Sequence, residues 1–320
     1  MSENVIEARG LSKSYGRIRA VADLDLNVKR GECHGFLGPN GAGKTTVIKS
    51  FLGLTTPDAG EVSIFGRDLF LERDEIMRRV GAVVEAPSLF GDFTARENLR
   101  YLSRFSSSAG GDSSFLSRSK IDDALCTVGL DDAADRKVGE FSYGMKQRLG
   151  IAQALLPESE LIFLDEPTNG LDPHGIMGVR ELIRRLRGNF GITIFISSHL
   201  LAEVEQVCDR VTIIDHGRVV RESLVSDLVA EGETLDVRVE NAAEFAEFAD
   251  SEKLKVLSRK DIDGGGGAFV VEGRESDVPA LCRKLVRKKI AILGVSKRQN
   301  SLEDVFVELT GKDGSDSFAD

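Results

Sequence analysis

GPNGAGKTT, residues Gly38 to Thr46, is the stretch that decides the fold. It follows CHGFL, an apolar run typical of a buried strand, and it leads into KTTVIKSFLGL, which has the pattern of a helix. The loop matches G-x-x-x-x-G-K-[ST] in the strand, loop and helix order that gives this motif its meaning. The alternative is a glycine-rich turn that matches the motif by chance. Such a turn would have no reason to lie between a buried strand and a helix. The sequence therefore predicts a loop that binds the phosphates of ATP or GTP.

The predicted contacts of this loop come from both backbone and side chains. We expect glycines to supply backbone angles that turn successive N–H groups inward, at Gly38, Gly41 and Gly43. Lys44 adds a mobile positive charge, and the Thr45 hydroxyl suits Mg²⁺. The positive end of the following helix dipole lies at the same place. The phosphate contacts predicted are Gly38, Pro39, Asn40, Gly41, Ala42, Gly43, Lys44, Thr45 and Thr46.

Two acids end a second apolar strand in LIFLDEP, residues Leu161 to Pro167. A buried strand that ends in two carboxylates indicates a site at that end, and the phosphate loop offers one. We expect Asp165 to hold Mg²⁺ through its water shell and Glu166 to polarise the attacking water. Two solvated acids at a strand edge are the alternative. A phosphate loop followed by this pattern predicts nucleotide hydrolysis.

The bulk composition limits the classes of protein. The chain has 320 residues, 41% hydrophobic content and a formal net charge of −10. The acidic balance argues against nucleic acid as a partner, because such binding depends on basic patches. No apolar run is long enough for a membrane helix, and the first residues lack the features of a signal peptide. We expect Cys33, Cys126 and Cys208 to be reduced thiols of the core.

The pattern of elements predicts two domains. Short strands alternate with amphipathic helices over residues 1–222, and a helical insertion interrupts them over about 94–155. The Ser/Gly-rich segment 106–119 is predicted to be a flexible loop within that insertion. Residues 223–233 are predicted to be a linker, 234–311 a small α+β domain, and 312–320 a polar tail. The fold class is therefore α/β.

A third motif, FSYGMKQRLG, begins with a hydroxyl and a glycine and continues as a helix. Ser142 can cap that helix, and the first N–H groups of the helix form a second anion site. Taken alone, the motif is an ordinary helix start. Its position in the chain relative to the other motifs favours the second interpretation, a second phosphate contact.

GPNGAGKTT, FSYGMKQR, LIFLDEPTNGLDP and ISSHL occur in this order, and residues 1–222 resemble the ATP-binding subunit of ABC transporters. The resemblance implies a P-loop ABC ATPase core with an antiparallel β subdomain, and it implies hydrolysis of ATP with Mg²⁺. It also implies a second ATPase subunit, expected to be an identical copy, so that two ATPs lie between the two subunits. The C-terminal region, ending in SLEDVFVELTG, resembles accessory domains of ATPases that drive integral-membrane ABC-2-type permeases.

The same resemblance implies roles for individual residues. Tyr15 is similar to the aromatic residue that stacks on adenine, with a core tyrosine as the alternative. Ser142 and Gly144 would contact the nucleotide of the opposite subunit, although Tyr143 and Met145 depart from the usual LSGGQ pattern. Asp172 would link the two sites across the dimer, or it is simply an acidic turn before a proline. His199 would sense the γ-phosphate, which makes Lys44, Glu166 and His199 the catalytic candidates.

Glu85, in GAVVEAPSLF, stands where this family normally has a glutamine that reaches Mg²⁺ and whose loop contacts the permease. A carboxylate is a stronger Mg²⁺ ligand than an amide, so Glu85 is predicted to be a metal contact with Thr45 and Asp165. An exposed acid at a strand end is the alternative. A similar glutamate together with GMKQR is familiar in ATPases of bacitracin and lantibiotic self-protection exporters.

The resemblance thus implies an ATPase at the cytoplasmic face of the membrane that powers a separate permease, and this permease is expected to export an antibiotic, peptide or lipid-like compound. A soluble ABC ATPase acting on ribosomes or nucleic acid is one alternative, and an importer subunit is another. A basic cluster in the C-terminal region could face lipid headgroups or a partner, or it is a solvated helix face. Its members are Arg283, Lys284, Arg287, Lys288 and Lys289.

Overall fold

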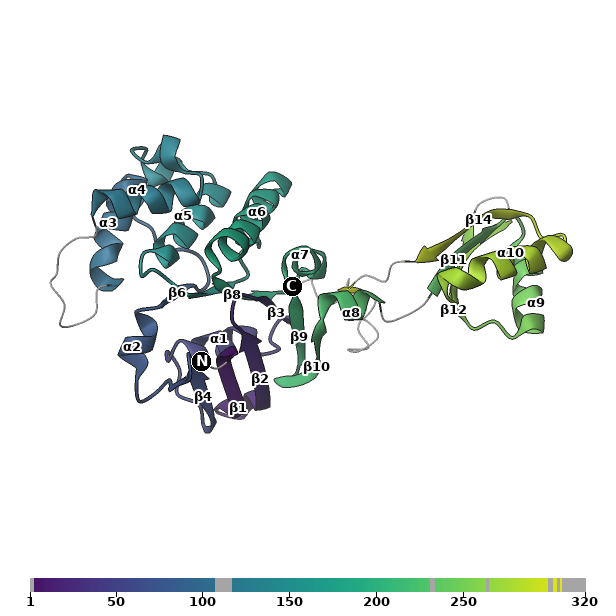
Figure 1. Ribbon diagram of the computed structural model, residues 1–320, viewed down its shortest axis with the longest axis horizontal. Helices are drawn as coiled ribbons and strands as arrows, with labels where there is room; N and C mark the ends of the chain where they lie inside the picture. Colours follow the sequence, from purple (N-terminus) through teal and green to yellow (C-terminus); the bar gives the residue numbers. More distant parts are fainter. Residues whose placement is uncertain are drawn as a thin grey trace. The chain divides into compact units, whose positions relative to one another are not determined.

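The computed structural model describes residues 3–106, 117–230, 234–262 and 265–298, together with Leu302, Glu303 and Phe306. The chain divides into two compact units, and the division falls between Val225 and Ser226 (Figure 1). Most of the predicted Ser/Gly-rich loop, the last three positions of the predicted linker and the polar tail 312–320 lie outside the described residues. Within the described ranges, none of the helices combines the length and the apolar character that a bilayer span requires.

A mostly parallel sheet forms the centre of the first unit and confirms the predicted α/β class. Its strand order is β10-β9-β3-β8-β7-β6, and only β10 runs antiparallel to its neighbour. The carboxyl ends of β3, β7 and β8 therefore meet at one edge, where ligands of such sheets bind. The strands are β3 (Cys33–Leu37), β6 (Val80–Val83), β7 (Leu161–Asp165), β8 (Thr193–Ser198), β9 (Arg210–Asp215) and β10 (Arg218–Leu224).

A second, antiparallel sheet lies in the same unit, in the order β2-β1-β4-β5. Its long strands alternate buried and exposed residues, as expected when one face of a sheet packs on a core. Helix α1 (Lys44–Phe51) contacts both β2 and β7 and so joins the two sheets (Figure 1). The strands are β1 (Asn4–Tyr15), β2 (Ile18–Lys29), β4 (Ala59–Ile64) and β5 (Arg67–Asp68).

Four phenylalanines hold α1 against the parallel sheet. The ring of Phe195 lies 5.5 Å from that of Phe36, 5.8 Å from that of Phe51 and 5.6 Å from that of Phe163. All four side chains are fully buried. Burial of each ring stabilises the fold by about 1.5–3 kcal/mol. This packing fixes the helix that begins at the phosphate loop.

Helices fill the range of the predicted insertion and cover the rest of the sheet. Helices α3, α4 and α5 group together on the side of the unit away from β1 and β2, with α6 packed on α5 (Figure 1). Residues 225–230, within the predicted linker, form the short helix α8. The helices are α2 (Arg73–Met77), α3 (Ala95–Ser106), α4 (Arg118–Thr127), α5 (Tyr143–Leu155), α6 (Pro173–Phe190), α7 (Leu201–Val207) and α8 (Val225–Ala230).

The second unit has the order β-α-β-β-α-β, with its four strands arranged β12-β13-β11-β14 and all pairs antiparallel. This is the split βαβ arrangement of ferredoxin-like folds. Its core is apolar and includes Phe245 and Phe269, whose ring centroids lie 4.4 Å apart. The elements are β11 (Thr234–Val239), α9 (Ala242–Glu252), β12 (Val256–Ile262), β13 (Gly266–Glu272), α10 (Val278–Arg287) and β14 (Ile292–Arg298).

The cysteines differ in burial. Cys33 and Cys208 are buried free thiols with their sulfurs 3.5 Å apart, as expected for reduced core cysteines. Cys126 is exposed, so its assignment to the core was wrong. It lies on α4, whose buried residues are Ile121, Ala124 and Leu125, and the next position along the helix points outward.

Candidate active site

The phosphate loop connects the end of β3 with the start of α1. Gly43 has φ 104° and is the N-cap of α1, and a Cβ there would lie 2.2 Å from the carbonyl oxygen of Ala20. Gly38 does not adopt a positive φ, so the predicted reason for that glycine was wrong. A Cβ on Gly38 would lie 2.6 Å from the carbonyl oxygen of Ile214, so close packing excludes a side chain. The first N–H groups of α1 have no side-chain cap, as suits an anion site.

Lys44 is nearly buried within this loop. Its Nζ donates hydrogen bonds to the carbonyl oxygens of Gly38 at 2.8 Å and Pro39 at 3.3 Å. The same nitrogen lies 3.3 Å from Oε1 of Glu166. The loop therefore places one positive charge beside the acid at the end of β7.

Thr45 and Asp165 meet where α1 begins and β7 ends. The Thr45 hydroxyl donates a hydrogen bond to Oδ2 of Asp165 at 2.9 Å, and Asp165 is 4% exposed. The hydroxyl of Ser197 donates to the other carboxylate oxygen, Oδ1. Ser197 was not predicted as a site residue. Its position follows from the register of β7 and β8, which pairs Asp165 with Ser197.

Glu166 follows Asp165 with a left-handed backbone, φ 49°. Its N–H donates to the hydroxyl and the carbonyl oxygens of Ser197, both at 3.1 Å. Such a φ is costly for a residue with a side chain, and the two bonds to Ser197 hold it. The turn directs the Glu166 carboxylate away from β7, toward Lys44 and His199.

His199 holds the other oxygen of the Glu166 carboxylate. Nδ1 of His199 lies 2.7 Å from Oε2 of Glu166, and the backbone N–H of His199 donates to the same oxygen at 3.3 Å. Because an ionised carboxylate only accepts hydrogen bonds, Nδ1 carries a proton in this pair. Burial disfavours the charged form of Glu166. The hydrogen bond from His199 and the charge of Lys44 outweigh it, so the pKa of Glu166 lies below its ordinary value.

The predicted second phosphate contact lies at the exposed starts of two neighbouring helices. The Ser142 hydroxyl caps α5 by accepting a hydrogen bond from the N–H of Met145 at 3.2 Å, as predicted. Asp172 caps α6 in the same way, through the N–H of Gly175 at 3.0 Å. A Cβ on Gly144 would lie 3.4 Å from the Cα of Gly175, so the two helix starts are close. Ser142 is exposed.

Tyr15 ends β1 on the surface, with 49% of the residue exposed, so it is not a core tyrosine. Its hydroxyl lies 3.4 Å from the hydroxyl of Thr55, and Nζ of Lys13 lies 5.6 Å from the ring centroid. An accessible ring face is what adenine stacking requires.

Glu85 follows β6 with φ 62° and a side chain that is 69% exposed. Its carboxylate accepts a hydrogen bond from Nζ of Lys49, on α1, at 3.0 Å. Among the described residues, this contact with Lys49 is the one its carboxylate makes, rather than one with Thr45 or Asp165. The structure therefore brings together Lys44, Thr45, Asp165, Glu166 and His199, with Glu85 outside that group.

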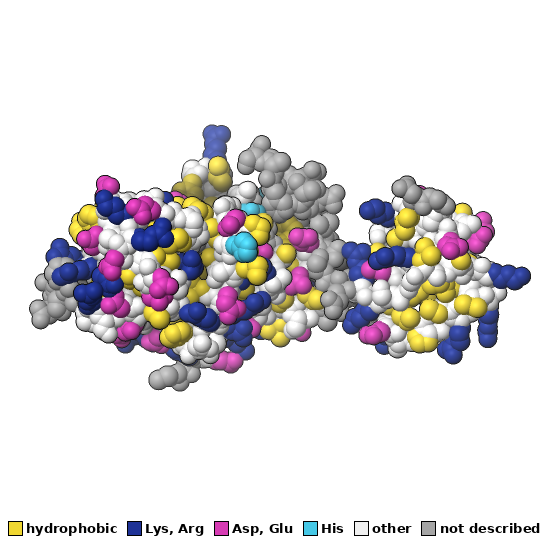
Figure 2. Space-filling view, turned by 90° about the horizontal axis from the view of Figure 1, so that it is seen from above, with side chains coloured by type: hydrophobic (Ala, Val, Ile, Leu, Met, Phe, Trp, Pro, Cys, Tyr) yellow, Lys and Arg dark blue, Asp and Glu magenta, His cyan; other side chains and the backbone are white. Residues whose placement is uncertain are grey.

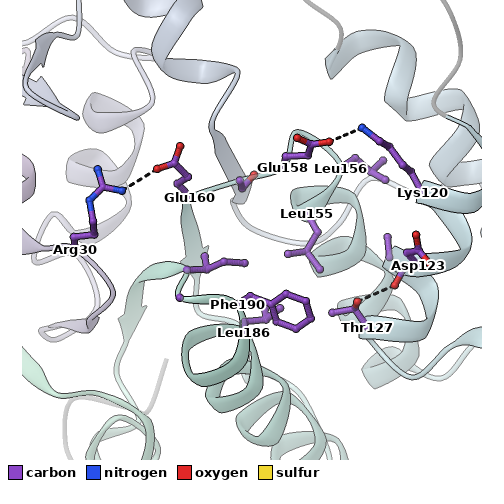
Figure 3. Close-up of a pocket in the computed structure, with 14 residues that line it drawn as sticks. Arg30, Lys120, Asp123, Thr127, Leu155, Leu156, Glu158, Glu160, Leu186 and Phe190 are labelled. Atoms are coloured by element: carbon purple, nitrogen blue, oxygen red, sulfur yellow. Dashed lines mark hydrogen bonds and ion pairs between the residues drawn. The ribbon is translucent and has the colours of Figure 1, made fainter.

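A cavity of about 630 Å³ lies elsewhere, between the helical insertion and the central sheet (Figure 3). Apolar side chains of Leu155, Leu156, Leu186 and Phe190 line it, and charged residues that include Arg30 and Glu160 stand around them (Figure 3). Glu160 precedes β7, whereas Asp165 ends it, so about 16 Å of strand separates the cavity from the site. None of the predicted site residues lines this cavity.

The chain is similar to known proteins over its whole length. The family model "ABC transporter" matches residues 21–169. The chain is 41% identical to the bacitracin transport ATP-binding protein BcrA of Bacillus licheniformis, over 96% of this chain and 97% of BcrA. It is 38% identical to the Nod factor export ATP-binding protein I of Burkholderia orbicola, over 99% of this chain and 100% of that protein.

A solved structure extends the comparison to a nucleotide complex. The ATP-binding cassette MJ0796, a dimer in a post-hydrolysis state bound to ADP and Pi, aligns with a TM-score of 0.59 and 26% identity. The alignment covers 69% of this chain and 98% of that one. The phosphate loop, the two acids at the end of β7 and these similarities all indicate the same class of protein. This chain belongs to the ATP-binding, ATP-hydrolysing subunits of ABC transporters.

Proposed function

We propose that the chain drives a separately encoded ABC-2-type permease that exports an antibiotic, peptide or lipid-like compound from the cytoplasmic face of the membrane. The observation that carries this proposal is the extent of the similarity. Two relatives whose names specify bacitracin transport and Nod factor export match 96% and 99% of this chain. The C-terminal unit is therefore shared with them along with the ATPase unit.

The proposed chemistry depends on Glu166, the acid that directly follows β7. Glu166 accepts a proton from the attacking water, and its lowered pKa keeps it ionised at neutral pH. Lys44 and the loop N–H groups bind the phosphates, while His199 orients the carboxylate. Tyr15 stacks on the adenine.

The residues present suit Mg²⁺. Thr45 and Asp165 offer a hydroxyl and a carboxylate oxygen 2.9 Å apart, and hard oxygen donors are what Mg²⁺ prefers. Within the part of the chain that the structure describes, no cluster of three or more His, Cys, Asp or Glu side chains forms a dedicated metal cage. Mg²⁺ in nucleotide sites takes few protein ligands and several from phosphate and water. When bound, it neutralises charge that develops on the phosphates. Glu85 is a third proposed ligand, reached by movement of its exposed side chain.

Hydrolysis would require a second subunit, proposed to be an identical copy. Ser142 and Gly144 begin α5 at the surface, on different elements from the phosphate loop of the same chain. In the proposed dimer they would bind the γ-phosphate of the partner's ATP, with Asp172 at the contact between the subunits. The dimeric state of the MJ0796 cassette supports this arrangement.

An aromatic patch next to the Glu85 loop is the proposed contact with the permease. The rings of Phe90, Phe93 and Tyr101 pack together, with Phe90 lying 5.3 Å from Phe93 and 5.2 Å from Tyr101. Each of the three residues is between 37% and 44% exposed. The Asn98 side chain holds the loop by hydrogen bonds to the N–H of Phe90 at 2.8 Å and to its carbonyl oxygen at 2.9 Å. A rigid, exposed aromatic cluster is typical of a binding hot spot.

Co-expression with candidate ABC-2-type permeases tests the proposal. We expect co-purification that resists high salt and ATP-dependent movement of the compound out of the cytoplasmic compartment. Replacement of Phe90 and Tyr101 by Ser should weaken the complex while ATP binding persists. Co-sedimentation with ribosomes in place of a membrane partner would assign the chain to the soluble class instead. Accumulation of the compound inside cells would identify an importer.

A further inference from the structure

The charges of the second unit are segregated along the chain. Residues 278–302 contain seven Lys and Arg residues and no Asp or Glu. Residues 226–277 contain fourteen Asp and Glu residues and six Lys and Arg residues. One basic region thus stands within a protein whose formal net charge is −10.

The basic region forms one connected piece of the unit. It consists of α10 and the edge strand β14, which pack against each other. Helix α10 buries Leu281 and Leu285 against the core, and its opposite side is exposed. Arg283 and Arg287 are four residues apart and share that exposed side. On the face of the unit seen in Figure 2, lysine and arginine side chains stand around much of the margin together with a few acidic side chains, and hydrophobic side chains lie between them.

Three of these seven cations have no acidic partner among the described residues of the unit. Lys284 pairs with Glu252, with Nζ 2.6 Å from Oε2, and Lys288 acts on the same carboxylate at longer range. Within the described ranges, Arg283, Arg287 and Lys289 form no ion pair with an acid. Their charge is therefore available to an anionic partner.

Exposed apolar side chains lie on the same two elements. Val286, on the exposed side of α10, is 66% exposed, and Leu293, on β14, is 58% exposed. Cations that surround apolar side chains are typical of segments that rest on anionic membranes. The aromatic residues Phe245, Phe248 and Phe269 of this unit are buried, so the surface offers no stacking platform for nucleic acid bases.

We propose that the surface formed by α10 and β14 binds directly to anionic lipid headgroups. Arg283, Arg287, Lys288 and Lys289 would contact phosphates, while Val286 and Leu293 enter the interface. This contact is separate from the one proposed between the first unit and the permease. It would add a lipid-dependent attachment that needs neither ATP nor the permease.

Vesicle flotation with the full chain tests this proposal. Phosphatidylcholine vesicles with and without phosphatidylglycerol serve as probes, in the absence of any permease. The test variant carries Arg283→Gln, Arg287→Gln and Lys288→Gln. The matched control carries Lys255→Gln, Arg259→Gln and Lys260→Gln, which lie on or next to β12 at the opposite edge of the sheet. Circular dichroism confirms that both variants are folded.

We expect the wild type and the control to bind the anionic vesicles and not the neutral ones. The test variant should lose on the order of 100-fold in partitioning, since each basic residue near such a surface contributes about fivefold. Val286→Ser should lower binding a few-fold even at high salt, because its contribution is apolar. ATPase activity should not change in any variant, so a failure here leaves the ATPase function intact.

Three outcomes would overturn the proposal. Equal binding to neutral and anionic vesicles would exclude headgroup charge as the cause. An equal loss in the control variant would show that net charge, rather than this surface, determines binding. Tighter binding to a single-stranded RNA oligomer than to the anionic vesicles would assign the surface to nucleic acid.

Discussion

Oε2 of Glu166 lies 2.7 Å from Nδ1 of His199, while Oε1 of the same carboxylate lies 3.3 Å from Nζ of Lys44. The two oxygens of one acid are thus held by two elements, the loop after β8 and the phosphate loop. Each contact favours the ionised form, and together they fix the plane of the carboxylate. A general base must be both ionised and correctly oriented in order to take a proton from water.

Replacement of Glu166 by Gln should stop hydrolysis without preventing ATP binding. The amide is nearly isosteric and can still accept a hydrogen bond from His199, but it cannot take a proton from water. We expect kcat to fall by about 10²–10⁴-fold. ATP should then accumulate on a stable dimer, measured by size-exclusion chromatography with bound nucleotide. Glu160→Gln, at the other end of the same strand, is the control and should hydrolyse ATP normally. A Glu166→Gln monomer that turns over ATP at the wild-type rate would refute the assigned role.

Lys44 should contribute to ATP affinity itself. Its Nζ donates to the carbonyl oxygens of Gly38 and Pro39, so it both shapes the loop and carries charge to it. Hydrogen bonds that involve a charged group contribute about 1.5–3 kcal/mol each, so Lys44→Ala should weaken ATP binding at least about 10-fold. Isothermal titration calorimetry measures this change. Lys49→Ala removes a lysine from the same helix but outside the loop and should bind ATP as the wild type does. An unchanged affinity in Lys44→Ala would contradict the proposed role of Lys44 in binding the phosphates.

The motifs predicted most of this arrangement because they are local in sequence. Lys44 and Thr45 follow β3, Asp165 and Glu166 follow the buried residues of β7, and His199 follows β8, so parallel pairing of these strands brings them together. Ser197 escaped prediction because its role depends on the register between β7 and β8, which no single segment encodes. The sequence analysis explained the glycine at position 38 by its backbone angles. The structure shows another reason, because the backbone of Ile214, a residue distant in sequence, leaves no room for a side chain.

In the C-terminal unit, too, the pairing of segments that are distant in sequence could not be predicted. Its alternating pattern predicted strands and helices, but the strand order β12-β13-β11-β14 places the last strand beside the first. That pairing depends on packing of both helices on one apolar core and not on any turn signal. Helix α8 was missed because Val225 and Leu228 are the buried residues among those whose burial the structure describes in this helix, and two apolar positions give little periodicity.

Glu160 should make stability depend on pH in acid. Nε of Arg79 lies 2.6 Å and Nη1 of Arg30 lies 2.8 Å from its carboxylate oxygens. The hydrogen bond from Arg79 is the main cause that lowers the pKa of Glu160 to about 2. Because the folded pKa lies below the unfolded one, the stabilisation is present above about pH 4.5 and is lost as the pH falls toward about 2.

Urea unfolding of Glu160→Gln measures this effect. The side chain is 41% exposed, so solvent screening limits the loss at about pH 7 to about 1 kcal/mol. We expect the wild type and the variant to converge in stability as the pH approaches about 2. Glu181→Gln, an exposed change on α6, should match the wild type throughout. A constant difference between Glu160→Gln and the wild type at every pH would show that shape, and not charge, is the cause.

Glu85 should matter for coupling more than for ATP binding. Its ion pair with Lys49 is exposed and is worth about 1 kcal/mol or less, so stability alone does not explain a carboxylate at this turn. A glutamine would keep an oxygen that can coordinate Mg²⁺ and accept a hydrogen bond from Lys49, whereas an alanine would remove both. We expect Glu85→Gln to retain most transport in a reconstituted complex and Glu85→Ala to lose it several-fold at unchanged ATP affinity.

Lys49→Ala distinguishes a role of the metal contact from a role of the ion pair, because it breaks the ion pair and keeps the carboxylate. If Lys49→Ala loses as much transport as Glu85→Ala, the ion pair and not the metal contact is responsible. Equal transport by Glu85→Ala and the wild type would show that Glu85 has no role in coupling ATP hydrolysis to transport.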